Sequence, residues 1–128
     1  MYPVTTTTAI ILGLWLVVLS LRVIGARRSE NTSNGDGGNE TLSRRIRAQG
    51  NLSEYAPLGL ILLLLAEMQG ANIGSTAVPA SIFVVGRLLH GYAFSFTSSW
   101  GFGRVGGMLM TFGGLILLTI ANIWVLLA

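Results

Sequence analysis

The chain has 128 residues, of which 52% are hydrophobic and 10% are charged, whereas soluble domains carry about 25% charged residues. Its net charge of +3 comes from arginines that lie beside long apolar stretches, so the basic balance indicates membrane orientation rather than nucleic-acid binding. The absence of cysteine excludes disulfides, thiolate metal ligands and a cysteine nucleophile, and a single histidine with few acids predicts no metal site.

The first apolar run predicts a membrane-spanning helix over about residues 4–26, since a span needs roughly 20 apolar residues. Arg22, Arg27 and Arg28 lie at or beyond the end of this run. A signal peptide carries its positive charge before the apolar stretch, so the reversed order predicts an uncleaved anchor.

A polar stretch over residues 29–41 is rich in turn-forming residues and predicts a loop. It contains two matches to the N-glycosylation pattern, at Asn31 and Asn39. A second helix is predicted over about residues 42–69, with a first half that is polar on one face and a second half that is almost wholly apolar. Pro57 lies at the border of the two halves and predicts a kink.

A third span is predicted over about residues 77–97, entered through Pro79, and a fourth over about residues 104–127. The connections before and after the third span are short. We therefore expect residues 1–128 to form one all-α domain, an integral membrane four-helix bundle whose surroundings are the lipid bilayer.

The distribution of arginine predicts the orientation of this bundle. The turn between the second and third spans carries no charge, and Arg104 lies beside the connection between the third and fourth. Five more arginines crowd the first loop and its flanks: Arg27, Arg28, Arg44, Arg45 and Arg47. The first and third connections should therefore face the cytosol and both termini should face outward, which would leave the glycosylation-like sites cytosolic and unused.

The second helix carries a polar face within an apolar chain. Arg47, Asn51 and Glu54 are spaced i, i+4, i+7, so they share one face, and Tyr55 flanks it. One interpretation is a salt-bridge ladder that anchors the helix end at the headgroups. The other is the polar wall of a ligand site, in which the arginine holds a carboxylate, the asparagine an amide and the glutamate an ammonium group. A ligand that offers all three is a peptide or an amino acid.

The third and fourth helices bring further polar groups to the same depth. Arg87 and His90 are spaced i, i+3, and Phe94 extends their face. Arg87 could instead form a buried pair with Glu54, and His90 could be a hydrogen-bonded packing residue. Arg104 is expected to open the fourth helix, where the helix dipole would strengthen an anion site. The positive-inside rule predicts the same residue as a topology anchor.

Several segments of the chain resemble a known family. The run over residues 47–58 is similar to the helix-two signature R-A-x-x-N-x-x-E of the MAPEG family, the membrane-associated proteins of eicosanoid and glutathione metabolism. Residues 20–28 resemble the end of the first helix in its leukotriene-forming synthases, and Arg87 and Arg104 also fit. The short length and the glycine-rich fourth helix, which contains the close-packing pair Gly103 and Gly107, resemble the bacterial branch.

The resemblance implies a homotrimer in a bacterial inner membrane, with the cosubstrate glutathione bound between protomers near the cytosolic face. Gln49 lies about 200° round the helix from Arg47, so one helix could serve two pockets. The family usually places tyrosines where this chain has His90 and Phe94, which removes two hydroxyl groups. The implied glutathione contacts are Arg27, Arg47, Gln49, Asn51, Glu54, Tyr55, Arg87, His90 and Phe94.

The resemblance also implies a mechanism and leaves two alternatives. Arg104 would stabilise the glutathione thiolate, which would attack an apolar electrophile arriving from the bilayer. One alternative is a non-catalytic scaffold of the same fold that binds lipid or a partner. The other is a small four-helix transporter, but such exporters rely on an acid in the first helix, and this helix has none. Glu67 is the only membrane acid far from the basic end, and the sequence does not assign it a role.

Overall fold

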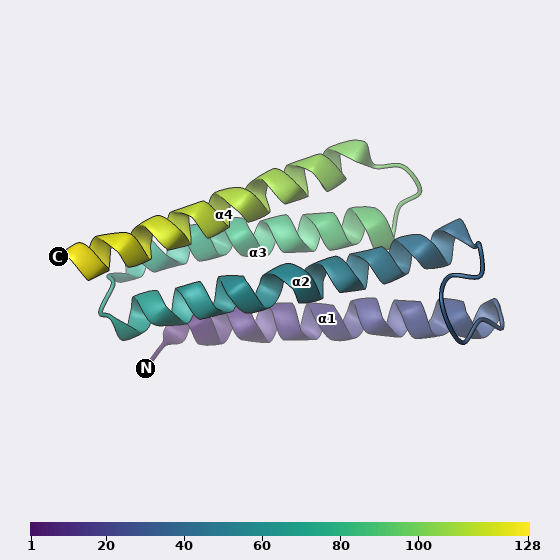
Figure 1. The fold of residues 1–128 in the computed structure, drawn as a ribbon, viewed down its shortest axis with the longest axis horizontal. Coiled ribbons are helices and arrows are strands. Elements are labelled where there is room, and N and C mark those ends of the chain that lie inside the picture. The colour runs from purple at the N-terminus through teal and green to yellow at the C-terminus, as the bar shows by residue number, and fades with distance from the viewer.

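The computed structural model describes all residues from 1 to 128 as four long antiparallel helices: α1 (Pro3–Ser29), α2 (Glu40–Met68), α3 (Ile73–Ser95) and α4 (Gly101–Leu127) (Figure 1). All four are long and apolar enough to cross a membrane, so the prediction of an all-α four-helix bundle is confirmed. Both termini lie at one end of the bundle, which we call the terminal end (Figure 1). The α1–α2 loop and the α3–α4 connection lie at the opposite end, which we call the basic end.

α3 starts earlier than predicted, at Ile73 instead of near residue 77. The reason is a cap, because the Asn72 side chain accepts a hydrogen bond of 3.0 Å from the Ser75 amide. Pro79 therefore lies inside the helix rather than at its entrance. α2 likewise continues through Pro57 as one helix.

α4 also starts earlier than predicted, at Gly101. The expectation that Arg104 opens this helix is wrong, because the Arg104 amide already donates a helical hydrogen bond of 3.3 Å to the Trp100 carbonyl oxygen. Arg104 is the fourth residue of α4, so it lies within one turn of the helix N-terminus but does not itself supply a free amide.

Close packing of α4 against α3 depends on glycine. A Cβ atom added at Gly107 would lie 2.7 Å from the backbone nitrogen of His90, and one added at Gly114 would lie 2.7 Å from the Cβ of Phe83. These two glycines, seven residues apart, face α3, whereas the space beside Gly103 is filled by a tryptophan side chain of its own connection. The expected close contact of the fourth helix is therefore with α3, through a seven-residue rather than a four-residue spacing.

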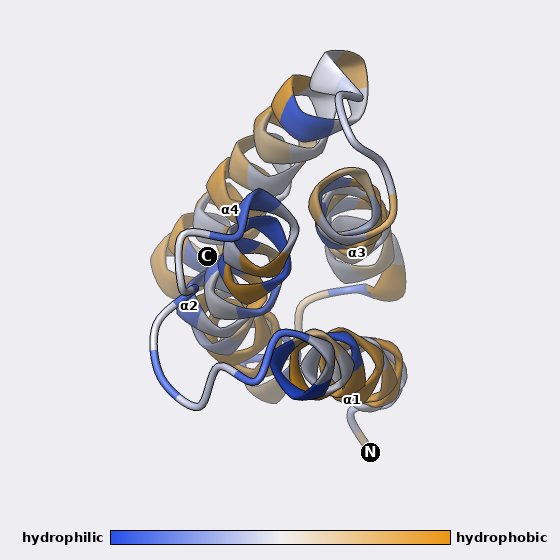
Figure 2. Ribbon diagram, turned by 90° about the vertical axis from the view of Figure 1, so that its right-hand side faces the viewer, coloured by the Kyte–Doolittle hydropathy of each residue, from blue (hydrophilic) through white to orange (hydrophobic).

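α3 packs against all three other helices, whereas α1 and α4 make no contact with each other. Towards the basic end α4 diverges from α2 (Figure 1 and Figure 2). Hydrophobic residues cover much of all four helices, and hydrophilic residues gather where α1 ends and α2 begins (Figure 2). Many large apolar side chains, such as Leu14, Ile61 and Leu109, are exposed, as expected of a surface that faces lipid.

At the terminal end, a side chain of α2 caps α1. The Glu67 carboxylate accepts hydrogen bonds from the amides of Val4 (3.2 Å) and Thr5 (2.8 Å). α1 has no capping side chain of its own, so this carboxylate satisfies amides that would otherwise be free and offsets the positive end of the helix dipole. The acid that a transport function would have to use is thus engaged in holding α1 to α2.

Candidate functional site

The C-terminus of α3 is capped by arginines from the two helices beside it. Arg22 of α1 donates to the Ser95 carbonyl oxygen at 2.6 Å, and Arg44 of α2 donates to those of Ala93 (3.1 Å) and Thr97 (2.7 Å). α3 has no basic residue in its own last turn, so these guanidinium groups supply the positive charge that favours a helix C-terminus. They fix the end of α3 against α1 and α2, beneath the candidate site.

Arg87 is the most deeply buried charged side chain, with 1% of its surface exposed. Its Nη1 donates to Oδ1 (2.7 Å) and to the backbone oxygen (3.2 Å) of Asn51, and its Nε donates to the Thr111 hydroxyl at 2.8 Å. Its Nη2 lies 3.3 Å from the Met108 sulfur. The alternative of a buried pair with Glu54 is therefore wrong. Arg87 bonds instead to the neutral amide of Asn51, which lies one helical turn before Glu54.

Through these contacts Arg87 connects α2, α3 and α4. Its guanidinium also lies 5.1 Å from the centre of the Tyr55 ring, within cation–π range. Every donor nitrogen of the side chain is directed at the chain itself, so the geometry favours Arg87 as a residue that positions Asn51 and Tyr55. Direct contact of Arg87 with a ligand stays a prediction.

Arg47 and Glu54, the other members of the predicted polar face, have exposed side chains. Neither side chain makes a hydrogen bond within the chain. Tyr55 is half-buried between Arg87 and Phe112, with ring centres of the two aromatics 5.9 Å apart. The face therefore divides into a buried asparagine that serves the fold and two exposed charges that remain available to a ligand.

A cavity of about 310 Å³ opens between α3 and α4 at the basic end. The His90 and Phe94 rings lie 4.8 Å apart in it, and the Arg104 guanidinium lies 5.2 Å from the centre of the Phe94 ring. The remaining walls are apolar: Val105, Met108 and Leu109. An aromatic floor with one exposed cation at its edge suits a ligand that has both an anionic and an apolar part.

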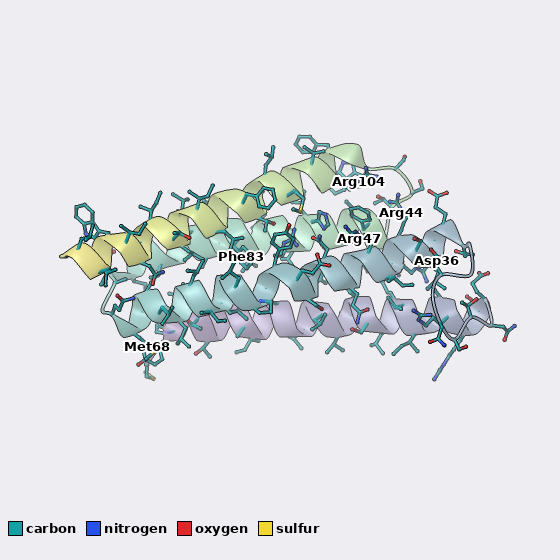
Figure 3. The ribbon with its side chains drawn as sticks, in the orientation of Figure 1. Asp36, Arg44, Arg47, Met68, Phe83 and Arg104 are labelled. Carbon is teal, nitrogen blue, oxygen red and sulfur yellow. The ribbon has the colours of Figure 1, made fainter.

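Three arginines from three helices act electrostatically on His90, namely Arg87, Arg104 and Arg47. Figure 3 shows Arg44, Arg47 and Arg104 gathered at the basic end. The structure thus brings together the charged groups that helical depth predicts to converge, although they come from α2, α3 and α4.

Two predicted contacts lie elsewhere. Arg27 donates to the backbone oxygens of Ser33 (3.2 Å) and Gly35 (2.8 Å), which folds the α1–α2 loop against the end of α1. Gln49 donates to the Ser20 hydroxyl on α1 at 3.2 Å. Gln49 therefore faces α1, as expected from the roughly 200° between Gln49 and Arg47, whereas Arg27 belongs to α1 itself and contacts the loop. Neither residue lines the cavity beside Arg104.

The loop that Arg27 folds has its own internal contact. The Gly38 amide donates a 3.0 Å hydrogen bond to the Asp36 carboxylate, which holds the pKa of that carboxyl below its ordinary value. This carboxylate therefore stays charged beside the arginines of the basic end.

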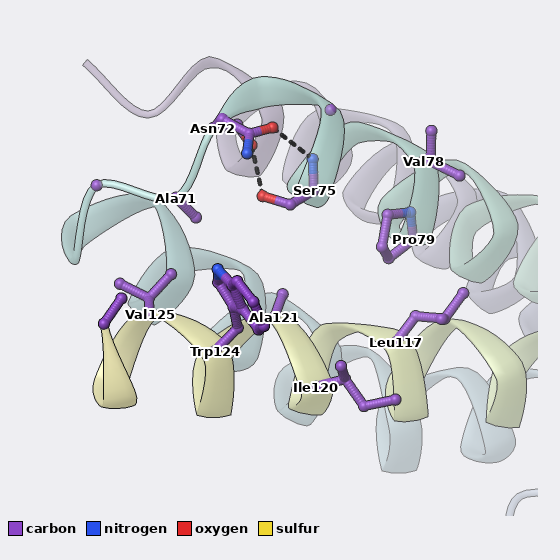
Figure 4. Close-up of a pocket in the computed structure, with 13 residues that line it drawn as sticks. Ala71, Asn72, Ser75, Val78, Pro79, Leu117, Ile120, Ala121, Trp124 and Val125 are labelled. Atoms are coloured by element: carbon purple, nitrogen blue, oxygen red, sulfur yellow. Dashed lines mark hydrogen bonds between the residues drawn. The ribbon is translucent and has the colours of Figure 1, made fainter.

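A larger cavity, of about 750 Å³, lies at the terminal end between the α2–α3 turn, the start of α3 and the end of α4 (Figure 4). Its walls are mainly apolar and include Trp124 and Leu117. The polar groups of Asn72 and Ser75 bond to each other across the start of α3 (Figure 4). No charged side chain lines this cavity, so the candidate site is the one at the basic end.

Comparison with known proteins identifies the relationship. The model of the MAPEG family matches residues 5–124. The chain belongs to the MAPEG family. It is also 34% identical over 122 residues to the inner membrane protein YecN of Escherichia coli strains K12 and CFT073, an alignment that covers 94% of this chain and 91% of that protein. Family membership and four spanning-length helices make the chain an integral, multi-pass membrane protein.

Sequence reasoning missed several residues that build this MAPEG site. Arg22 and Arg44 cap α3, and Met108 and Thr111 receive Arg87. A signal for the last two was present, because Arg104, Met108 and Thr111 are spaced i, i+4, i+7 and so share the face of α4 that meets α3. No comparable signal marks the caps, since they depend on which helices are neighbours.

Proposed function

We propose that this MAPEG protein is a membrane-bound glutathione transferase-like enzyme. Glutathione would bind near the cytosolic face, and its thiol would attack an apolar electrophile that arrives from the bilayer. The observation that carries the proposal is the pairing of an apolar cavity with free charges at its edge. Arg104 and Arg47 are exposed cations without an internal anion, in a part of the chain where charge is costly.

The distribution of the predicted contacts supports a site shared between protomers of a homotrimer. Arg47 and Glu54 are exposed on α2 and Arg104 is exposed on α4, whereas Arg27 lies at the end of α1 and Gln49 bonds to α1. A single ligand reaches both groups only if a neighbouring protomer brings its α1 side to the cavity. The exposed charges on each protomer would then be buried together with the ligand.

Each ligand group has a partner of suitable chemistry. Arg47 would hold a carboxylate of glutathione and Glu54 its ammonium group. Tyr55, fixed by Arg87 and Phe112, would donate its hydroxyl to the peptide. His90 and Phe94 form the aromatic floor of the cavity and would support the apolar electrophile.

Arg104 would carry the chemical step. A free thiol has a pKa of about 8.5, so a guanidinium beside the sulfur favours loss of the thiol proton to water. The thiolate electron pair then forms the new sulfur–carbon bond, and the leaving group departs with the pair of the bond that breaks. The enzyme supplies position and charge stabilisation, and no group of the protein changes covalently.

The test is glutathione binding to the purified protein in detergent by calorimetry, followed by conjugation to an aryl halide. The proposal predicts saturable binding and glutathione-dependent release of halide. Arg28→Ala is the matched control, because Arg28 is exposed and lies outside the cavity. Binding without turnover would favour a non-catalytic protein of the same fold, and the absence of glutathione binding would contradict the proposal.

A further inference from the structure

A second basic cavity, of about 300 Å³, lies at the same end of the bundle on the other side of Phe94. Its walls are mainly polar, unlike those of the cavity beside Arg104. They come from the end of α1, the start of α2, the end of α3 and the connection after it, and they include Arg22, Glu40, Arg44, Arg45, Phe94 and Phe96. Three guanidinium groups thus share this space with one carboxylate, so the cavity carries an excess of positive charge.

One buried donor in this cluster has no acceptor. The Nε of Arg45 is buried and makes no hydrogen bond, although its Nη1 donates to the Arg22 backbone oxygen at 3.3 Å. The positive charges of Arg22 and Arg45 also act on each other. A buried N–H of a cation is costly when it is left unpaired, and two like charges repel. An oxyanion in the cavity would relieve the repulsion between these guanidinium groups.

The surroundings of the cavity place it at the depth of lipid headgroups. The Arg22 guanidinium lies 3.7 Å from the centre of the Phe96 ring, and this ring stacks on that of Tyr92 with centres 5.1 Å apart. Trp100 packs edge-on against Tyr92, and all three aromatic side chains are exposed. Exposed aromatic side chains collect at the membrane–water interface, where phospholipid phosphates lie.

We propose that this cavity binds the phosphate group of an anionic phospholipid, held by Arg45 and Arg22 with Arg44 beside them. Basic pockets between membrane helices suit such headgroups, and guanidinium groups suit phosphate oxygens. Inorganic phosphate offers the same chemistry, but the aromatic border favours the lipid. The bound headgroup would join α1, α2 and α3. This proposal does not depend on glutathione binding.

The experiment uses the full-length protein in zwitterionic detergent. Phosphatidylglycerol, phosphatidylcholine and inorganic phosphate are each titrated, and bound lipid is counted by native mass spectrometry while thermal unfolding is followed. We expect phosphatidylglycerol alone to bind and to raise the unfolding temperature. Arg45→Gln should weaken its binding about tenfold. Arg28→Gln, which removes the same charge from an exposed position of α1, should leave binding unchanged.

Arg45→Lys provides a second variant in case Arg45→Gln folds poorly. It keeps the charge but lacks the planar guanidinium fork, so we expect binding between that of the wild type and Arg45→Gln. Equal binding by Arg45→Gln and Arg28→Gln would overturn the site, because only net charge would then matter. Stabilisation by inorganic phosphate equal to that by phosphatidylglycerol would overturn the lipid as its occupant.

Discussion

At both ends of the bundle, charged side chains of one helix cap the end of a neighbouring helix, but the two ends differ in the charges that remain unpaired. At the terminal end, Glu67 of α2 caps α1, and this carboxylate is engaged by two backbone amides. At the basic end, Arg22 and Arg44 cap α3 in the same way, but some guanidinium groups there have donors without an internal acceptor. Arg47 and Arg104 are exposed, and the Arg45 Nε is buried and unpaired.

This difference separates charges that serve the fold from charges that serve a ligand. A charge at membrane depth is costly unless it is paired or faces water. At the terminal end, the Glu67 side chain is engaged by backbone amides, and no charged side chain lines the large cavity. The basic end has several charged side chains, on both sides of Phe94. Uncompensated charge, rather than cavity size, therefore marks the functional end of the molecule.

The largest expected effect is that of removing a spare charge from the candidate site. Arg104→Ala should lower the conjugation rate about 10²- to 10³-fold while leaving glutathione binding largely intact, because the charge acts on the developing thiolate. Arg47→Ala should instead weaken binding first, since its carboxylate partner does not change during the reaction. Steady-state kinetics and calorimetry of both variants check this contrast. Equal losses in both measurements for both variants would remove the distinction between their roles.

Removing an engaged charge should damage stability instead. Arg87→Leu would leave the Asn51 and Thr111 side chains without their buried partner, at a cost of about 3 kcal/mol in the free energy of unfolding. Denaturant titration in detergent measures this, with Arg104→Ala as the control that should unfold like the wild type. If Arg87→Leu unfolds like that control, Arg87 does not hold the helices together.

The glycine contact that positions His90 over the cavity predicts a smaller effect. Gly107→Ala would force a Cβ to 2.7 Å from the His90 backbone nitrogen, which should cost about 2 kcal/mol. Gly106→Ala is the matched control, because nothing lies within 4 Å of a Cβ added at Gly106. Thermal unfolding should separate the two variants. Equal melting temperatures would contradict the α3–α4 packing.

The smallest effect is expected at the terminal end. Glu67→Gln keeps a hydrogen-bond acceptor but loses the charge that offsets the α1 dipole, so it should cost about 1 kcal/mol and leave conjugation unchanged. Amide hydrogen exchange of Val4 and Thr5 would show faster opening of the first turn. Loss of conjugation with unchanged exchange would mean that Glu67 belongs to a functional pathway rather than to a cap.

Hydrophobic runs and arginine placement were enough to predict four spanning helices with the basic connections at one end. The depth of Arg47, Arg87 and Arg104 followed from the same pattern. Periodicity did not distinguish Asn51 from Glu54 as the partner of Arg87, because both lie on one face. In the structure Arg87 bonds to the neutral amide of Asn51, and Glu54 is exposed.

Other features depend on contacts that a one-dimensional pattern does not contain. The role of Glu67 requires that α1 and α2 be neighbours with their ends aligned. α4 begins at Gly101 rather than near residue 104, because the glycine-rich segment before Arg104 is part of the helix. The low helix propensity of glycine gave no signal for this earlier start.

The central claim is that the spare charge of Arg104 acts on a bound thiol. The most direct measurement is the ultraviolet absorbance of the thiolate of bound glutathione, titrated across pH in the wild type and in Arg104→Ala. The account predicts that glutathione bound to the wild type titrates well below the ordinary thiol pKa of about 8.5, and that the variant binds glutathione but returns its titration to that value. Bound glutathione that titrates identically in both proteins would contradict the account and leave Arg104 as an anchor of topology.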